Sequence, residues 1–497
     1  MQNLPKIITP KGYSIRKDFL GPEKVKEVCQ ELTMTPRTAM AARGGGAPPF
    51  PIYMESGSRL YLPRAWAQAK FGPADADIVG AGAPLPSVVS FIGSPYDYQI
   101  KIIETFIGAG ANGLLCVPCG KGKTFMAINI AVRLGRRVLI VVDKEFLLNQ
   151  WRGEIERFAP ALRVGILQAD RVQVATADYD CTICMIQTLC SREYPDGFFA
   201  DYGFTIFDEC HHLGAAHFSR ALQKIQTKYL LGLSATPTRE DGMTQVFEAF
   251  LGKPVYWEKR READPTVIVR AITYHDFADP DWSNVPTDYA GEVVLARLLS
   301  KIVESPARTA LIVRLLVDLC SEGTRQILVL SERKVLLEAV EAALPPAIKQ
   351  GYYIGGMKDA VRERNAAEAQ VLLATYSMAS DALNIKTLNC VILASPRKRV
   401  EQSTGRILRQ RPEERTLAPL IVDIVDIHDT YKNMYRKRAE YYKQCGYQIS
   451  IEKTAADGKI QVVRSTRPAA VAAAEEAENE IVQSRTIADG DECVIKI

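Results

Sequence analysis

The segment that most constrains the fold is a glycine-bearing turn placed between an apolar run and a helical pattern. Residues 117–124 read Val-Pro-Cys-Gly-Lys-Gly-Lys-Thr, after the apolar run 113–117 and before a helical pattern that starts at Phe125. Glycines let successive backbone N–H groups turn toward one anion, and the helix N-terminus adds a partial positive charge. The sequence therefore predicts a buried strand, a phosphate-binding loop and a helix, with a nucleoside triphosphate as the ligand.

Two side chains of this loop have individual predicted roles. Lys123 is expected to reach the β and γ phosphates, and the Thr124 hydroxyl is expected to bind Mg²⁺. The alternative, for so short a motif taken alone, is a strand-to-helix turn that carries an exposed lysine. The predicted nucleotide-binding residues are Pro118, Cys119, Gly120, Lys121, Gly122, Lys123 and Thr124.

Two stretches of the chain alternate short apolar runs with helix-length patterns. Continuous apolar runs separated by helices are typical of parallel sheets covered on both faces, so the predicted fold class is α/β. The first stretch has predicted strands at 113–117, 137–142, 164–166, 181–186, 204–208 and 229–234. The second has them at 326–330, 371–376, 389–394 and 420–426, and it contains no phosphate loop.

A chain of 497 residues is too long for one hydrophobic core, so several domains are expected. Stretches rich in glycine, proline or charged residues separate the apolar segments and predict where the domains begin and end. The predicted parts are an N-terminal accessory domain at 1–88, a nucleotide-binding domain at 89–258, a connector at 259–293, a second α/β domain at 294–445 and a C-terminal extension at 446–497. Within the connector, residues 266–273 form the one strand-like run.

Composition narrows the class of protein. The chain is 47% hydrophobic and 24% charged, which is typical of a soluble globular protein. The start lacks a signal-peptide core and no apolar run is long enough to span a bilayer, so we expect a soluble, intracellular protein without a membrane partner. The formal net charge of +4 is too small to argue for a nucleic-acid partner by itself.

The eleven cysteines do not form a small disulfide framework. Cys116/Cys119 and Cys181/Cys184 have the spacing of metal ligands, but both pairs fall in strand-like runs, where residues three apart point to opposite faces. Reduced, buried thiols are the preferred interpretation.

Two carboxylates and two hydroxyls follow predicted strands of the first domain. Asp208 and Glu209 end the run 204–208. Beside a phosphate loop, Asp208 is suited to hold Mg²⁺ and Glu209 to polarise the attacking water. Ser234 and Thr236 end the run 229–234 and are candidates for coupling nucleotide state to domain position, with a simple strand cap as the alternative.

The second domain offers a basic pattern instead. Gln402, Arg406 and Arg409 have helical spacing on roughly one face. Arginines presented to the γ-phosphate would stabilise the charge that develops during phosphoryl transfer. A basic surface helix is the alternative.

Taken in this order, the segments resemble the motifs of superfamily 2 helicases and translocases over residues 91–426. The resemblance implies two tandem RecA-like domains and an ATP-dependent enzyme, with ATP as the nucleotide and Gln99 reading adenine. Residues 208–211 resemble a DExH motif, 374–381 lie in the place of motif V, and 402–409 resemble motif VI. The coupling residues that the resemblance implies are His211, Ser234, Thr236, Arg239, Glu240, Asp241 and Asp381.

Finer features resemble the XPB and UvsW branch of DNA helicases and the poxvirus-type transcript-release helicases of large DNA viruses. They are Pro118-Cys119-Gly120, Arg239-Glu240-Asp241 and residues 353–358. The resemblance implies a monomeric motor with 3′ to 5′ polarity acting on single-stranded, duplex or forked DNA, with RNA polymerase or replication machinery as partners. For a viral protein it also implies the host nucleus, the cytoplasm or the virion.

One departure keeps other functions open. Relatives carry Gly-Leu-Asp where this chain has Ala382-Leu383-Asn384. An ATP-holding nucleic-acid scaffold that does not unwind, and a motor that tracks RNA, are therefore the alternatives. From position alone, strand contacts are expected near residues 144–145, 187–188 and 331–334.

Overall fold

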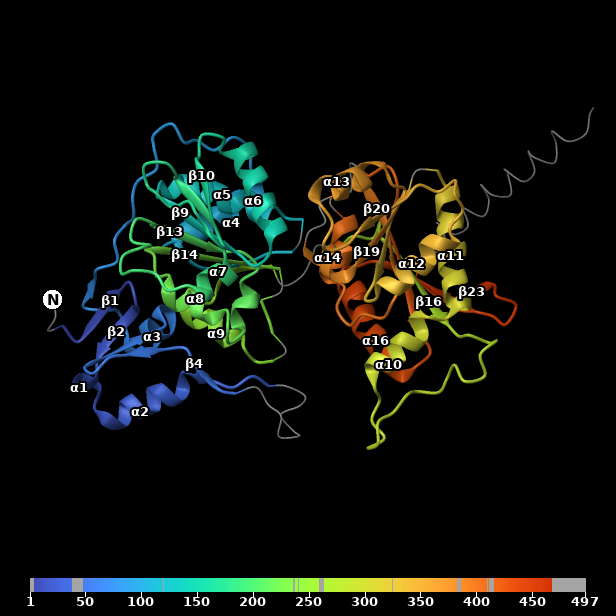
Figure 1. The fold of residues 1–497 in the computed structure, drawn as a ribbon, viewed down its shortest axis with the longest axis horizontal. Coiled ribbons are helices and arrows are strands. Elements are labelled where there is room, and N and C mark those ends of the chain that lie inside the picture. The colour runs from blue at the N-terminus through green and yellow to red at the C-terminus, as the bar shows by residue number, and fades with distance from the viewer. Residues whose placement is uncertain are drawn as a thin grey trace, which may run out of the picture. The chain divides into compact units, whose positions relative to one another are not determined.

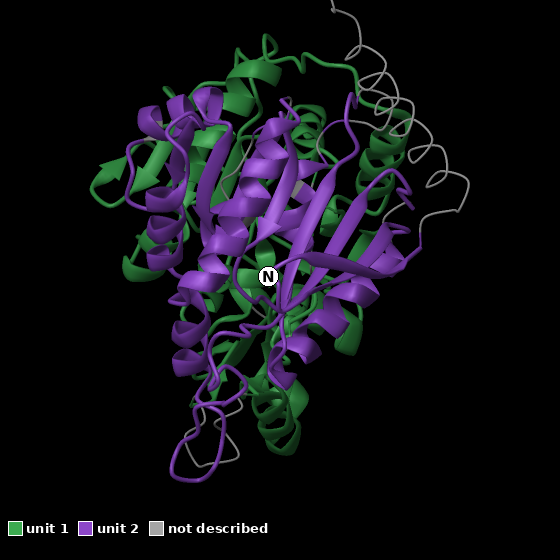
Figure 2. Ribbon diagram, turned by 90° about the vertical axis from the view of Figure 1, so that its right-hand side faces the viewer, with its two compact units in different colours: residues 1–259 green, residues 260–497 purple. Residues whose placement is uncertain are grey.

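The computed structural model divides into two compact units, residues 1–259 and 260–497, and each is described by itself (Figures 1 and 2). The residues that it describes are 4–37, 48–118, 120–235, 237–239, 241–258, 263–323, 325–381, 385, 387–408, 410 and 415–466. Both units are built on a largely parallel sheet, for which the described residues supply eight strands in each case. Together with the helices on their faces, these sheets are two tandem RecA-like domains, as the sequence predicts.

The main sheet of the first unit has the order β11-β10-β12-β9-β13-β14-β8-β15, and only the β10–β11 pair is antiparallel. Its strands are β8 Asn112–Cys116, β9 Val138–Val142, β10 Val164–Gln168, β11 Arg171–Val172, β12 Cys181–Met185, β13 Phe204–Phe207, β14 Tyr229–Ser234 and β15 Pro254–Trp257. The helices are α4 Asp97–Gly108, α5 Lys123–Leu134, α6 Glu145–Phe158, α7 Ile186–Ser191, the 3₁₀ turn η2 Cys210–Gly214, α8 Ser219–Lys224 and α9 Thr244–Leu251.

The sheet is buried on both faces, which explains why its strands read as continuous apolar runs. Along β9, Leu139 and Val141 join one core, which also contains residues of α8 and α9. Ile140 points the other way, into a second core with residues of α5 and α6. The predicted strands agree with the observed ones to within two residues, because burial on both faces produces the continuous apolar runs from which the strands were predicted.

A smaller sheet precedes the main one in the first unit. Its order is β5-β6-β2-β1-β7, from β1 Lys6–Thr9, β2 Gly12–Arg16, β5 Met54–Glu55, β6 Arg59–Leu62 and β7 Ala76–Asp77. Beside it lie α1 Lys17–Leu20, α2 Pro22–Glu31, α3 Arg64–Phe71 and the short pair β3 Thr33–Met34 and β4 Phe50–Pro51. The α3 residue Arg64 is buried and donates to the Thr227 carbonyl oxygen at 3.1 Å, so it fastens this sheet to the main domain.

The main sheet of the second unit has the order β18-β19-β17-β20-β21-β16-β22-β23, and only the β22–β23 pair is antiparallel. Its strands are β16 Ile268–Tyr274, β17 Gln326–Ser331, β18 Gln350–Tyr353, β19 Val371–Thr375, β20 Leu388–Leu393, β21 Leu420–Asp426, β22 Gln448–Thr454 and β23 Ile460–Ser465. The helices are α10 Leu295–Val303, α11 Pro306–Ser321, α12 Lys334–Ala343, α13 Asp359–Glu368, α14 Tyr376–Asp381, α15 Glu401–Thr404, the 3₁₀ turn η3 Gly405–Ile407 and α16 Asp429–Gln444.

Two boundaries predicted from the sequence need correction. The predicted connector, 259–293, contains β16, which pairs with β21 on one side and β22 on the other and so lies inside the second sheet. The predicted C-terminal extension, 446–497, supplies β22 and β23 to the same sheet. The strand-like run predicted at 266–273 agrees with β16, but its place in the second sheet was missed, because pairing between segments about 180 residues apart leaves no local signal. Residues 467–497 of the predicted extension lie outside the described part of the chain.

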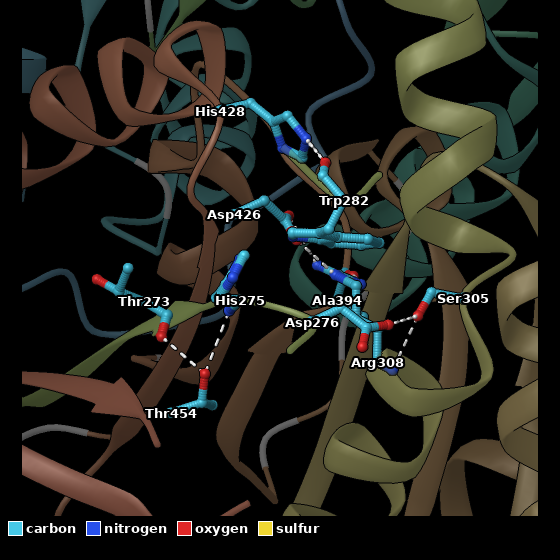
Figure 3. A network of polar contacts seen from close by, with 10 residues as sticks. All are labelled: Thr273, His275, Asp276, Trp282, Ser305, Arg308, Ala394, Asp426, His428 and Thr454. Carbon is cyan, nitrogen blue, oxygen red and sulfur yellow. Dashed lines mark hydrogen bonds and ion pairs between the residues drawn. The ribbon is translucent and has the colours of Figure 1, made fainter. Parts of the chain in front are cut away.

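The second unit also contains two buried arginine–aspartate pairs on β21. Arg308 of α11 donates to both carboxylate oxygens of Asp426, at 2.8 and 3.1 Å, and to the Ala394 carbonyl oxygen at 2.6 Å (Figure 3). On the other face of the strand, Arg438 of α16 donates to both oxygens of Asp423 at 2.8 Å. These pairs tie α11 and α16 to the sheet. Among the described helices, none has both the length and the apolar character needed to cross a membrane.

Candidate active site

The phosphate loop of the first unit joins β8 to α5, as predicted. Gly120 and Gly122 have φ values of +88° and +80°, in the left-handed region that favours glycine. A Cβ at Gly122 would lie 2.5 Å from Gln99 Nε2, so a larger residue there would be strained and would displace the Gln99 amide. Cys119 lies outside the described residues.

Gln99 holds this loop from the side of α4. Its Nε2 donates to the Lys121 carbonyl oxygen at 3.1 Å, and its Oε1 accepts from the Tyr96 amide at 3.0 Å. The Lys121 ammonium lies 4.9 Å from the centre of the Tyr98 ring and 3.4 Å from Glu258 Oε1. Gln99 is thus buried against the loop, where it fixes the turn; its reading of adenine stays a prediction.

The two predicted carboxylates lie beside the loop at the end of β13. Lys123 Nζ is 3.8 Å from Glu209 Oε1, and both side chains are mostly buried. Glu209 has a φ of +43°, an unfavourable conformation for a residue with a Cβ. Backbone strain of this kind persists where the surrounding structure enforces it and clusters at functional sites.

The two acids differ in their electrostatics. Asp208 Oδ2 accepts a hydrogen bond from the Trp151 indole at 2.8 Å, and Oδ1 accepts from the Glu209 amide at 3.0 Å. Burial and the neighbouring Glu209 charge raise the pKa of Asp208 to about 6. Burial also opposes ionisation of Glu209, but Lys123 and His211 outweigh it and hold the pKa of Glu209 well below its usual range. The surroundings therefore favour the ionised form of Glu209 more than that of Asp208.

Two histidines of the 3₁₀ turn continue the site. His211 Nδ1 lies 3.1 Å from Ser234 Oγ and 3.3 Å from Glu209 Oε2. His212 packs against His211 with tilted rings whose centres are 4.3 Å apart, and its Nε2 lies 3.7 Å from Asp143 Oδ2. Burial and the neighbouring His211 lower the pKa of His212 to about 4. The ring pair connects the end of β9 with the carboxylates and with the end of β14.

The segment after β14 is also joined to the 3₁₀ turn. Arg239 donates to the His211 carbonyl oxygen at 2.6 Å and to both oxygens of Asp241, at 3.0 and 2.5 Å. The Arg239 hydrogen bonds lower the pKa of Asp241. His211 is therefore contacted by Ser234 and Arg239, and Arg239 in turn contacts Asp241. Thr236 and Glu240 lie outside the described residues.

Comparison with known proteins identifies the family of this arrangement. The family model of the type III restriction enzyme res subunit matches residues 92–239. A candidate ATP-dependent RNA helicase, L396 of Acanthamoeba polyphaga mimivirus, is 32% identical over 461 residues, which cover 90% of this chain and 87% of the relative. The chain belongs to the superfamily 2 helicases of large DNA viruses. It is an ATP-dependent helicase.

Other relatives of this helicase are similar over a smaller part of the chain. A candidate ATP-dependent RNA helicase of African swine fever virus, QP509L, is 30% identical over 377 residues, covering 70% of this chain and 72% of the relative. Among solved structures, the Pyrococcus furiosus Hef helicase domain has 15% identity and a TM-score of 0.46, covering 69% of this chain and 98% of that one. T4 UvsW has 17% identity and a TM-score of 0.35, covering 87% and 96%.

The helicase motifs of the second unit are described in part. Gln402 lies on α15, which ends at Thr404, and Arg406 lies on the 3₁₀ turn that follows. The helical pattern predicted for 402–409 thus begins as an α-helix and continues into a 3₁₀ turn, and the shared face of the three side chains stays a prediction. Asp381 is the last residue of α14. The side chains of Arg406 and Asp381, and all of Arg409, Ala382 and Asn384, lie outside what the structure describes.

The first unit of the helicase offers oxygen ligands that suit Mg²⁺. The described residues contain no group of three or more His, Cys, Asp or Glu side chains arranged for a metal ion. Mg²⁺ bound with a nucleotide needs no such group, since it takes one or two protein oxygens together with phosphate oxygens and water. Asp208 at the end of β13 and Thr124 in the first turn of α5 supply oxygens of this kind.

Sequence reasoning missed two residues of this site. Trp151 lies 57 positions before its hydrogen-bond partner Asp208, and Asp143 contacts His212 across 69 positions. Neither pair has a local spacing that a motif search detects. The only available signal for Trp151 was a large aromatic residue within an otherwise polar stretch of α6.

Proposed function

We propose that this helicase hydrolyses ATP at the loop of its first unit and uses the hydrolysis to move along DNA. The observation that carries the proposal is the approach of Lys123 to Glu209 at 3.8 Å, with Asp208 adjacent, at the carboxyl edge of the sheet. A cation for the phosphates, a carboxylate for the metal and a charged carboxylate for the water are the parts that phosphoryl transfer requires.

Each residue has a proposed role. Lys123 binds the β and γ phosphates, while Thr124 and Asp208 hold Mg²⁺, which neutralises charge on the phosphates. Glu209 orients the attacking water. The position of its carboxylate supports this role, because Glu209 Oε1 lies 3.8 Å from Lys123 Nζ and Oε2 lies 3.3 Å from His211 Nδ1. Gln402, Arg406 and Arg409 retain their predicted role of stabilising charge at the γ-phosphate.

The contacts of the 3₁₀ turn support a coupling role. His211 contacts Glu209 on one side and Ser234 on the other, and Arg239 holds the backbone of His211. A change at the γ-phosphate that moves Glu209 therefore reaches the ends of two strands directly. We assign His211, Ser234, Arg239 and Asp241 to this coupling, together with Thr236, Glu240 and Asp381 from the sequence.

The proposed strand contact lies at the ends of the adjacent strands β9 and β12. Gln187 Nε2 donates to the Asp143 carbonyl oxygen at 2.7 Å, which brings the two predicted segments, 144–145 and 187–188, together. Thr188 is less suited to this role, because it is buried and its Oγ1 accepts from the Ala169 amide at 3.0 Å. Lys144 and Gln187 are the proposed contacts to the phosphates of the strand.

DNA is preferred as the track because residues 239–241 resemble the DNA-directed branch of the family. RNA is the second candidate, since the mimivirus and African swine fever virus relatives are both named as RNA helicases. Measuring ATP turnover side by side with single-stranded DNA, duplex DNA, forked DNA and RNA of one sequence separates them. Stronger stimulation by a DNA form supports the proposal, and stimulation by RNA alone overturns the DNA assignment.

The same assay tests the scaffold alternative. Tight ATP binding without strand-stimulated phosphate release would favour a clamp that does not unwind. For a motor, a role in viral transcription termination or in replication and recombination follows from the resemblance, with RNA polymerase or replication proteins as partners. Release of a transcript from a stalled polymerase, in the presence and absence of ATP, is the measurement for that role.

A further inference from the structure

A buried tryptophan lies against the carboxylate to which we assign the metal. Trp151 is on α6, is 0% exposed, and belongs to the core between α5, α6 and the main sheet. Its indole N–H donates to Asp208 Oδ2 at 2.8 Å. The distance is that of a normal hydrogen bond. Packing of the ring in the core does not by itself require a polar contact of this kind.

The indole is one of two donors that fix the carboxylate. The second is the Glu209 amide, which donates to Oδ1 at 3.0 Å. With one donor on each oxygen, the plane of the Asp208 carboxylate is defined and each oxygen keeps a lone pair for another ligand. Outer hydrogen bonds of this kind orient metal-binding side chains in proteins generally.

We propose that Trp151 is a positioning residue that orients the Asp208 carboxylate for a divalent cation bound with the nucleotide. The proposal rests on the proposed function, because it takes Asp208 as a ligand of that cation. Trp151 itself touches neither metal nor nucleotide. It acts through one hydrogen bond, so loss of the N–H should weaken the cation while leaving the contacts of the loop to the phosphates unchanged.

A second buried tryptophan provides a matched control. Trp282 of the second unit is 1% exposed and packs edge-on against Tyr274, with ring centres 5.4 Å apart. Its indole nitrogen has no hydrogen-bond partner among the described residues. Trp151 and Trp282 therefore share burial and core packing and differ in whether the N–H meets a carboxylate.

The test replaces each indole by 3-benzothienylalanine, in which sulfur takes the place of N–H and the ring shape is kept. Mn²⁺ stands in for the cation, and free Mn²⁺ is counted by electron paramagnetic resonance in the presence of a non-hydrolysable ATP analogue. Binding of the same analogue without metal is measured in parallel. The variants Trp151→Phe and Trp282→Phe repeat the comparison with natural residues.

The replacement at Trp151 should weaken Mn²⁺ binding roughly 10- to 100-fold, with metal-free analogue binding unchanged. The replacement at Trp282 should leave Mn²⁺ binding unchanged. Mn²⁺ affinity within twofold of the parent after replacement at Trp151 would overturn the inference, as would an equal loss at both tryptophans.

The variant Asp208→Asn separates this inference from the proposed function. If Asp208→Asn weakens Mn²⁺ and the replacement at Trp151 does not, only the inference fails. If Asp208→Asn leaves Mn²⁺ affinity unchanged, the metal role of Asp208 fails and the inference with it. Adding the Trp151 replacement to Asp208→Asn should cause no further loss, because two residues that act through one hydrogen bond are not additive.

Discussion

Each main sheet has an aspartate at the carboxyl end of one of its inner strands, and the hydrogen-bond donors around the two aspartates differ in charge. Asp208 follows β13 of the first unit, and its hydrogen bonds in the described part of the chain come from neutral donors, Trp151 and a backbone amide. Asp426 ends β21 of the second unit and is 0% exposed, with both oxygens bound by Arg308 (Figure 3).

The difference in hydrogen-bond partners separates an aspartate that is available to a ligand from one that stabilises the fold. A charge that an arginine fully compensates is unavailable to a ligand, so the Asp426 pair holds α11 to the sheet. A charge that burial and Glu209 disfavour, as at Asp208, is compensated best when a cation arrives. The first unit thus has a carboxylate whose hydrogen-bond donors in the described residues are neutral, whereas the second unit pairs its carboxylate with an arginine.

The largest expected effect is on catalysis in the first unit. Glu209→Gln removes the charge that orients water and leaves Lys123 without its acidic neighbour. ATP turnover at saturating ATP should fall roughly 10²- to 10³-fold, the usual result of removing one preorganised group. Glu193→Gln, on an exposed acid of the same unit, is the control and should keep the parent rate. Parent-like turnover by Glu209→Gln would place the active site elsewhere.

The next effect concerns the stability of the second unit. Asp426→Asn leaves the buried Arg308 without a charged partner, so the free energy of unfolding should fall by about 3–5 kcal/mol. Urea unfolding monitored by circular dichroism measures it. The double variant Arg308→Met with Asp426→Leu should recover most of the loss, because apolar groups of similar size need no partner. A loss below about 1 kcal/mol in Asp426→Asn would contradict a structural role for the pair.

The smallest effect is a pH dependence at His212. Its folded pKa of about 4 lies below the ordinary 6.5, so the folded protein binds fewer protons than the unfolded chain between these values. The parent should therefore lose stability as pH falls from 6.5 to 4. The ring is 37% exposed, and allowing for screening the loss is on the order of 1 kcal/mol or less.

His212→Gln removes this titration. The difference in unfolding free energy between variant and parent should change across this pH window and stay constant above it. A difference that is independent of pH from 4 to 7 would show that His212 is not held neutral by the fold.

The sequence was informative wherever a pattern is local. The phosphate loop, the runs buried on both faces and the acids at the end of β13 each occupy a few consecutive residues. The places of residues 120–124, Asp208 and Glu209 in the fold were therefore predicted correctly, while their roles stay predictions. The strand β16 was recognised as a strand-like run but assigned to a connector, because its neighbours β21 and β22 come more than 140 residues later. The partners of Asp208 and Asp426 were missed for the same reason: Trp151 and Arg308 are brought to them by the packing of helices on the sheet.

The most direct test of the contrast is the stability of Asp208→Asn. Because the fold raises the pKa of Asp208 from 3.8 to about 6, its ionised form costs stability above pH 6, and an amide avoids that cost. At pH 8, without nucleotide or metal, Asp208→Asn should be roughly 1 kcal/mol more stable than the parent in urea unfolding, opposite in sign to Asp426→Asn. Destabilisation by Asp208→Asn comparable to that by Asp426→Asn would contradict the account, since both aspartates would then be structural.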